Sequence, residues 1–163
     1  MRIDTPLLVL GRGPAALVAA KVAGASGQPC LLVGHEVTGG EVPVALEPAA
    51  VAVLVEHRLV DVLRPHLLAV DPLTIAPREF EEVVKQHCVA DLNVGVYDRM
   101  GLVERTLHGR SLRGVLTDGR TRWEVVADTW IDAGGPDVSL SAAIVAGAAA
   151  AAEAIGLLNH TTG

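Results

Sequence analysis

The 163-residue chain is poor in aromatic residues, lysine and cysteine, and these shortages exclude several classes of partner and binding site. The net charge is −6 and no basic block is present, which argues against nucleic acid as the main partner. Cys30 and Cys88 form no CxxC pair and match no metal-ligand spacing, so we expect free thiols, no metal site and a reducing, cytoplasmic environment. Aromatic residues make up only 2% of the chain. Core packing is the expected role of all of them, namely Phe80, Tyr97, Trp123 and Trp130.

Long hydrophobic runs are also missing. The longest, residues 6–10 and 142–152, fall short of the roughly 18–20 residues that a membrane helix needs. The apolar stretch near Met1 runs straight into a glycine loop, so we expect neither a signal peptide nor a membrane span. With 50% hydrophobic residues, the chain suits one well-buried domain spanning residues 1–163.

The first part of the chain predicts a β–α–β unit. Residues 6–10 form a continuous apolar run, which is typical of a strand buried on both faces of a parallel sheet. A helix is predicted over 14–26, with Pro14 in its first turn and Gly27 after its end. Residues 29–33 form a second buried strand, so a right-handed crossover between parallel strands follows.

The middle and end of the chain predict further elements. Residues 34–47 and 64–77 have the composition of loops, whereas 48–63 and 78–89 have helical spacing. Four short strands are predicted over 92–97, 101–107, 112–117 and 122–127, with a hairpin turn at Asp118-Gly119. A separate strand over 129–133 leads to a closing Ala-rich helix over 139–157, capped by Asp137 or Ser139. Its small side chains permit close contact with the sheet or with a second copy.

A glycine loop follows the first strand and points to nucleotide binding. Gly11 permits a sharp turn, Gly13 lets the backbone approach a pyrophosphate, and Ala16 is small enough for close helix–strand packing. Pro14 and Ala15 open the helix, whose N-terminus offers free N–H groups and a partial positive charge to phosphates. The alternative is a glycine turn that only packs tightly.

An acidic residue normally ends the second strand of such a site and holds the ribose hydroxyls. Here Gly34 stands at or near that place, and Glu36 is the first acid. Either the loop bends so that Glu36 reaches the ribose, or the contact is missing. His35 is a candidate cofactor contact, although a solvated loop histidine is the favoured interpretation.

These motifs resemble the FAD-dependent oxidoreductase superfamily, which includes the glutathione-reductase-like and hydroxybenzoate-hydroxylase-like FAD domains. The glycine loop with its Pro14 resembles the family's diphosphate loop, and Thr38-Gly39-Gly40 resembles the paired glycines after the ribose acid. Arg78 stands where an arginine of the family often approaches the cofactor. Residues 92–127 resemble its small antiparallel meander, and residues 130–135 resemble the following strand with its glycines, Gly134 and Gly135.

The closing segment completes the resemblance. Asp137 and Ser139, ahead of the Ala-rich helix, resemble the motif in which an acid meets the ribityl chain, although helix capping explains them equally well. The implied fold is α/β: a Rossmann-like three-layer domain with a parallel sheet, flanking helices and a small antiparallel β-meander. The implied cofactor is FAD, and the implied activity is that of a flavoprotein oxidoreductase.

One departure from the family is large. The family's substrate domain lies between the glycine-ending strand and the closing acid, but about one residue separates Gly135 from Asp137 here. Three hypotheses follow: an FAD-dependent oxidoreductase, or its FAD-bearing part, whose flavin is covered by a second copy or a partner protein; a non-catalytic carrier or sensor of FAD or another dinucleotide; and a degenerate domain used for protein interaction.

Overall fold

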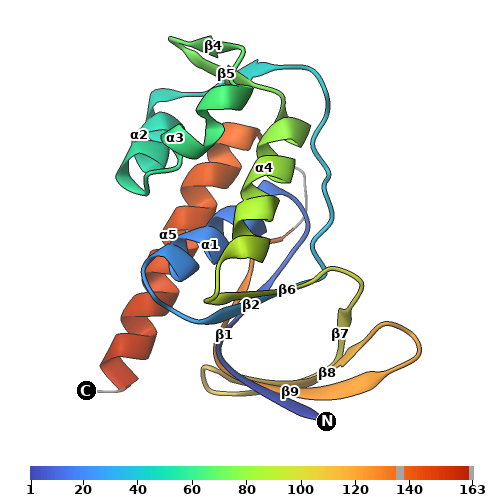
Figure 1. The fold of residues 1–163 in the computed structure, drawn as a ribbon. Helices are drawn as coiled ribbons and strands as arrows, with labels where there is room; N and C mark the ends of the chain where they lie inside the picture. Colours follow the sequence, from blue (N-terminus) through green and yellow to red (C-terminus); the bar gives the residue numbers. More distant parts are fainter. Residues whose placement is uncertain (135–137, 162–163) are drawn as a thin grey trace.

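Six strands form the main sheet of this protein, whose computed structural model describes residues 1–134 and 138–161. The strand order is β6-β2-β1-β9-β8-β7, in which β6, β2, β1 and β9 run parallel and β8 and β7 continue antiparallel (Figure 1). The strands are β1 (Arg2–Leu10), β2 (Cys30–Val33), β6 (Val94–Tyr97), β7 (Gly101–His108), β8 (Ser111–Thr117) and β9 (Arg122–Asp132). The predicted parallel sheet with its meander is confirmed.

The sheet separates two layers that cover its opposite faces. Successive side chains of a strand point to opposite faces, so Leu7 and Val9 pack under the helices while Leu8 and Leu10 face the other way. The helical layer consists of α1 (Pro14–Ala25), α4 (Pro77–Ala90) and α5 (Leu140–Thr161), which lie over one face in Figure 1. The meander contributes Leu112 and Leu116 to the second core. Three layers result, as predicted.

The last sheet strand is longer than predicted. Strands over 122–127 and 129–133 were expected, but β9 is continuous and pairs with β8 in its first part and with β1 as far as Asp132. Asp128 does not break it, because this carboxylate falls on an exposed position between the buried Ala127 and Thr129. The alternation of buried and exposed positions therefore runs through the acid.

The predicted helix over 48–63 is wrong in one respect, because it breaks into α2 (Pro48–Glu56) and α3 (Val60–Leu63). Arg58 takes a left-handed conformation with φ 58°. The Leu59 N–H donates to the Leu54 carbonyl at 2.8 Å and the Arg58 N–H donates to the Val55 carbonyl at 3.2 Å, which is the Schellman ending of a helix. Glycine usually occupies this left-handed position, and with Arg58 there the sequence shows no sign that the helix ends.

Both predicted loops contain secondary structure. A second, three-stranded antiparallel sheet has the order β3-β5-β4, and a 3-10 turn η1 (Arg64–His66) precedes β4. Its strands are β3 (Val44–Ala45), β4 (Ala69–Val70) and β5 (Leu73–Ile75). Segments of two or three residues are too short to produce a detectable alternation, and only Leu73 and Ile75 are buried.

The hairpin predicted at Asp118-Gly119 joins β8 to β9. Gly119 has φ 95°, and the Asp118 carboxylate accepts N–H bonds from Thr121 and Arg120, each at 2.8 Å. These backbone hydrogen bonds hold the pKa of Asp118 below its ordinary value. At the other edge of the second core, Tyr97 and Trp123 pack edge to face with ring centroids 6.1 Å apart, in keeping with a packing role.

The closing helix α5 extends to Thr161 and packs against α1, α2 and β9. Within the described residues it is the one helix long and apolar enough to cross a membrane, judged by length and composition alone. Within its span Leu140–His160, 44% of the 18-residue apolar window is buried against the rest of the chain, and core helices meet the same criterion.

Candidate functional site

The carboxyl ends of three parallel strands meet at one edge of the sheet. Gly11 follows β1, Gly34 follows β2, and Ala133 follows β9, where its N–H donates to the Leu10 carbonyl at 2.8 Å. Strand β1 lies between β2 and β9: the chain leaves β1 toward β2 on one side and reaches β9, on the other side, only after β6, β7 and β8. Ligands of open α/β sheets bind at such a switch point.

The glycine loop has the strand–turn–helix setting that the sequence predicts. Gly11 has φ 145° and Gly13 has φ 88°, conformations that L-residues with side chains rarely adopt. A Cβ at Gly11 would lie 3.1 Å from the Ala133 Cβ and 3.3 Å from the Ala16 Cβ, so the loop passes close to both. Pro14 begins α1 and Ala16 is fully buried. The sharp turn at Gly11, the glycine at position 13 and the small side chain of Ala16 therefore occur at the positions that the sequence predicts.

The acid candidate Glu36 lies at the rim of this loop. Its side chain is exposed and pairs with the exposed Arg12, with 2.7 Å between Oε2 and Nη2. Its backbone carbonyl accepts the N–H of Gly13 at 3.1 Å. Gly34, with φ 73°, allows the turn after β2 that brings Glu36 back over the glycine loop. The structure therefore brings Glu36 beside the predicted phosphate loop.

His35 is buried, so the expectation of a solvated histidine is wrong. Only 1% of the residue is exposed, and its Nε2 lies 3.1 Å from the Gly13 carbonyl oxygen. Because a carbonyl only accepts, Nε2 carries the proton in this contact. The same nitrogen lies 3.6 Å from Oε1 of Glu81, which is also fully buried.

Glu81 is a site residue that the sequence analysis missed. The side chain, in the second turn of α4, accepts the Thr38 N–H at 3.2 Å and also the Gly39 N–H. A sequence signal existed: Glu81 stands three and seven positions before Val84 and Cys88, on the buried stripe of the helix. An acid on such a stripe needs buried partners.

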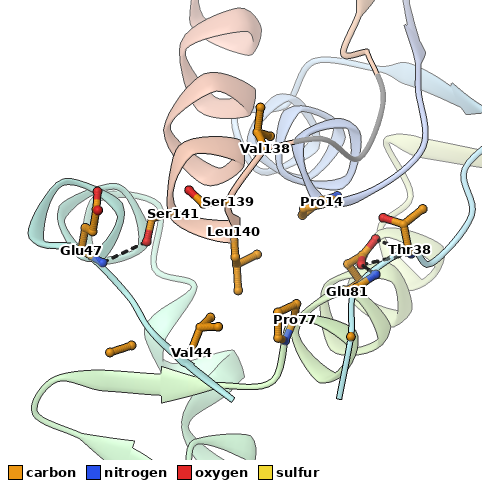
Figure 2. A pocket seen from close by; sticks show the side chains of 13 residues that line it. Pro14, Thr38, Val44, Glu47, Pro77, Glu81, Val138, Ser139, Leu140 and Ser141 are labelled. Carbon is orange, nitrogen blue, oxygen red and sulfur yellow. Dashed lines mark hydrogen bonds between the residues drawn. The ribbon is translucent and has the colours of Figure 1, made fainter. Parts of the chain in front are cut away.

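A pocket of about 370 Å³ opens beside these loops (Figure 2). Four helices present their N-terminal ends to it: Pro14 begins α1, Glu47 caps α2, Pro77 begins α4 and Leu140 begins α5. Each end carries the partial positive charge of its helix dipole, which suits an anionic ligand. The remaining lining residues are Thr38, Gly39, Gly40, Val44, Ala45, Glu81, Val138, Ser139 and Ser141.

The pocket brings some predicted residues together and not others. Ser139 lines it and also caps α5, since its Oγ accepts the Ala142 N–H at 3.1 Å. The Arg78 side chain pairs with Glu82 at 3.1 Å and Glu41 at 3.7 Å, and its backbone N–H donates to the Gly40 carbonyl.

Of the two glycines predicted after β9, the structure describes Gly134. Gly134 turns with φ 73° and donates its N–H to the Asp132 carboxylate at 3.0 Å. Gly135 and Asp137 lie outside the described residues.

No protein-family model and no curated protein matches the chain. Its structure is similar to that of the flavin-dependent monooxygenase PieE in complex with FAD and substrate, with a TM-score of 0.69 and 17% identity over 83% of this chain and 31% of PieE. The p-nitrophenol 4-monooxygenase PnpA from Pseudomonas putida DLL-E4 matches at TM-score 0.64 and 17% identity, over 80% of this chain and 40% of PnpA. PqsL from Pseudomonas aeruginosa, a probable FAD-dependent monooxygenase, matches at TM-score 0.61 and 14% identity over 78% and 41%.

The likeness therefore covers most of this chain but less than half of each neighbour. At these identities it shows the fold alone, and that fold is the Rossmann-type fold of FAD-binding flavoproteins, as the resemblance implied.

Proposed function

We propose that this chain binds FAD at the switch point of its sheet and forms the FAD-bearing part of an oxidoreductase. The observation that carries the proposal is the pocket onto which four helix N-termini converge, directly beside the glycine loop after β1. A diphosphate is the dianionic group that such an arrangement suits. When bound, a flavin supplies the electron transfer itself, and the protein supplies position and electrostatics.

The residues present fit the cofactor. Gly11, Gly13 and Ala15 would line the diphosphate, and the buried Ala16 would allow the close helix–strand packing behind them. Glu36 would accept the ribose hydroxyls in place of its contact with the exposed Arg12. Ser139 and the start of α5 would face the ribityl chain, and Gly39 and Gly40 also line the pocket. The Gly34, Arg78, Gly134, Gly135 and Asp137 contacts remain part of the same proposal.

The substrate side of the flavin is assigned to a second copy or a partner protein. The chain spans 31% to 42% of the lengths of the flavoenzymes compared with it, and this partial coverage supports a site that another chain completes. The same fact favours the second candidate, a non-catalytic carrier or sensor of FAD. Reduction by NADH or NADPH in the absence of oxygen tests the enzyme: bleaching of bound FAD supports it, and persistent colour supports a carrier or an enzyme whose partner is missing.

The proposal is tested by the visible spectrum of the purified protein and by titration with FAD. Gly13→Asp would place a carboxylate against the diphosphate, and we expect FAD affinity to fall at least about a hundredfold. Gly13→Ala has similar backbone strain without the charge and should lose less affinity. Gly109→Asp, in the β7–β8 turn at φ 62°, is the remote control and should bind like the wild type. A colourless wild-type protein that takes up no FAD would overturn the proposal.

A further inference from the structure

Gly13 is held on both of its backbone polar groups by two consecutive residues. The Gly13 N–H donates to the Glu36 carbonyl at 3.1 Å, and the Gly13 carbonyl accepts Nε2–H of His35 at 3.1 Å. With φ 88° and ψ −172°, Gly13 occupies a region of conformational space that is almost confined to glycine. A glycine without such contacts samples many backbone conformations. The two hydrogen bonds that join Gly13 to His35 and Glu36 therefore select one of them.

The conformation of Gly13 decides where α1 begins. Gly13 is the N-cap residue of α1 and has no side chain with which to cap it. Its position therefore sets the direction of the free N–H groups in the first turn, which the proposed diphosphate site needs. A hydrogen bond to the Gly13 carbonyl acts on the ligand site without touching a ligand.

Glu81 extends this contact to the second loop of the pocket. Its buried carboxylate accepts the Thr38 and Gly39 N–H groups and lies 3.6 Å from Nε2 of His35. A buried carboxyl group needs hydrogen-bond partners of this kind. Figure 2 shows the Glu81 side chain beside Thr38 at the edge of the pocket. One buried pair thus touches the glycine loop after β1 and the loop after β2.

We infer that His35 and Glu81 are positioning residues: together they fix the Gly13 loop and the Thr38–Gly39 loop relative to each other and so preorganise the cofactor pocket. The inference rests on the proposed function for its ligand but not for its geometry. Plain core filling does not explain a histidine here, because Nδ1 of His35 is buried with no hydrogen-bond partner among residues 1–134 and 138–161. An apolar side chain would avoid that cost, so the Nε2 contact must offset it.

The experiment compares two variants of His35 with one variant of the second core. FAD affinity is measured by titration below the unfolding temperature of each variant. His35→Gln keeps an N–H donor near the place of Nε2 and should bind FAD within about threefold of the wild type. His35→Leu keeps the bulk but removes the donor, and we expect about tenfold weaker binding. Leu116→Ala, in the second core, is the control for lost stability and should bind FAD normally. If His35→Leu weakens binding no more than Leu116→Ala does, the inference is overturned.

A second measurement does not need FAD. Exchange of the amide hydrogens of residue 13 and of residues 15–17 and 38–40 should be about tenfold faster in His35→Leu than in the wild type. In Leu116→Ala, only the exchange that occurs through global unfolding should become faster. In the variant Glu81→Leu combined with His35→Leu, the effects should be less than additive, because the pair acts as a unit. Failure of the wild type to bind FAD defeats the proposed function alone, whereas unchanged local exchange defeats the positioning role.

Discussion

At the scale of single residues, the pocket depends on glycines for two different physical reasons. Gly11 and Gly13 are required by backbone conformation, since both have positive φ. Gly39 is required by space: a Cβ there would lie 2.6 Å from the Pro77 carbonyl carbon, 2.7 Å from the Arg78 nitrogen and 2.7 Å from Oε2 of Glu81. The loop after β2 therefore touches the first turn of α4 with no room for a methyl group. Its neighbour Gly40 is exposed and differs in this respect.

The two adjacent glycines make a matched test of this contact. Gly39→Ala should lower the free energy of unfolding by about 1–3 kcal/mol, because backbone atoms must move to accept the Cβ, and it should weaken FAD binding through the displaced Thr38–Gly39 segment. A Cβ at Gly40 would meet no atom of the described residues within 4 Å, so Gly40→Ala should stay within about 0.5 kcal/mol of the wild type. Urea unfolding monitored by circular dichroism measures both. Equal stability of the two variants would contradict the close contact.

The same scale shows which site residues a sequence can predict. The need for Gly11, Gly13 and Ala16 is local, because a strand, a turn and a helix follow one another along the chain, and these residues fall where expected. The burial of His35 cannot be predicted from neighbouring residues, because it depends on the contact with Glu81, which lies on a helix distant in the sequence. Spacing between neighbours carries no information about such a contact.

At the scale of elements, buried segments are predicted well, whereas short, exposed or irregular segments are not. The apolar run over 6–10 gave only the buried end of β1, because the first residues of Arg2–Leu10 are more exposed. β2, α1 and α4 were predicted to within one or two residues, because buried strands and amphipathic helices leave clear patterns. The break between α2 and α3 was missed because Arg58 occupies the left-handed position at which glycine would announce a helix end. The strands of the small sheet were missed because Val44, Ala45, Ala69 and Val70 are exposed and form segments of two residues.

Helix α5 offers the sharpest test at this scale, because two glycines of one helix have opposite surroundings. Gly147 is buried at the crossing with α1, where an added Cβ would overlap the Ala15 carbonyl oxygen and lie 3.1 Å from the Val18 Cβ. Gly147→Ala should therefore lower the free energy of unfolding by about 1–3 kcal/mol. At Gly156 a Cβ would meet no described atom within 4 Å, so Gly156→Ala should raise it by about 0.5–1 kcal/mol through helix propensity.

Thermal or urea unfolding of the two variants measures this difference in sign. The helix start lines the pocket, so Gly147→Ala should also weaken FAD binding, whereas Gly156→Ala should leave it unchanged. A stabilised Gly147→Ala protein would mean that α5 lies farther from α1 than the structure has it.

At the scale of the whole molecule, one hydrophobic core joins the sheet to the helical layer. The reactivity of the two buried cysteines measures how tightly these layers stay together. Cys30 of β2 and Cys88 of α4 are buried in the same cluster, and their thiols face α1, with Sγ 3.7 Å from the Ala20 and Leu17 carbonyl oxygens respectively. Burial raises the pKa of each thiol from the ordinary 9.0 to about 12. Neither thiol becomes a nucleophile without separation of the layers.

The last prediction concerns alkaline pH and thiol labelling. Since the native thiols ionise near pH 12 and the unfolded ones near 9.0, the unfolded chain loses protons first as pH rises. The stabilisation by protonated thiols is therefore complete below pH 9 and is lost between pH 9 and 12, over which the free energy of unfolding should fall. At pH 8, a thiol reagent should label Cys30 and Cys88 at least about a hundredfold more slowly than in urea. Gln86→Cys, exposed on the same helix as Cys88, should react at once. Rapid native labelling of Cys88 alone would show that α4 detaches from α1 without global unfolding, and the pocket wall that carries Glu81 would then be mobile.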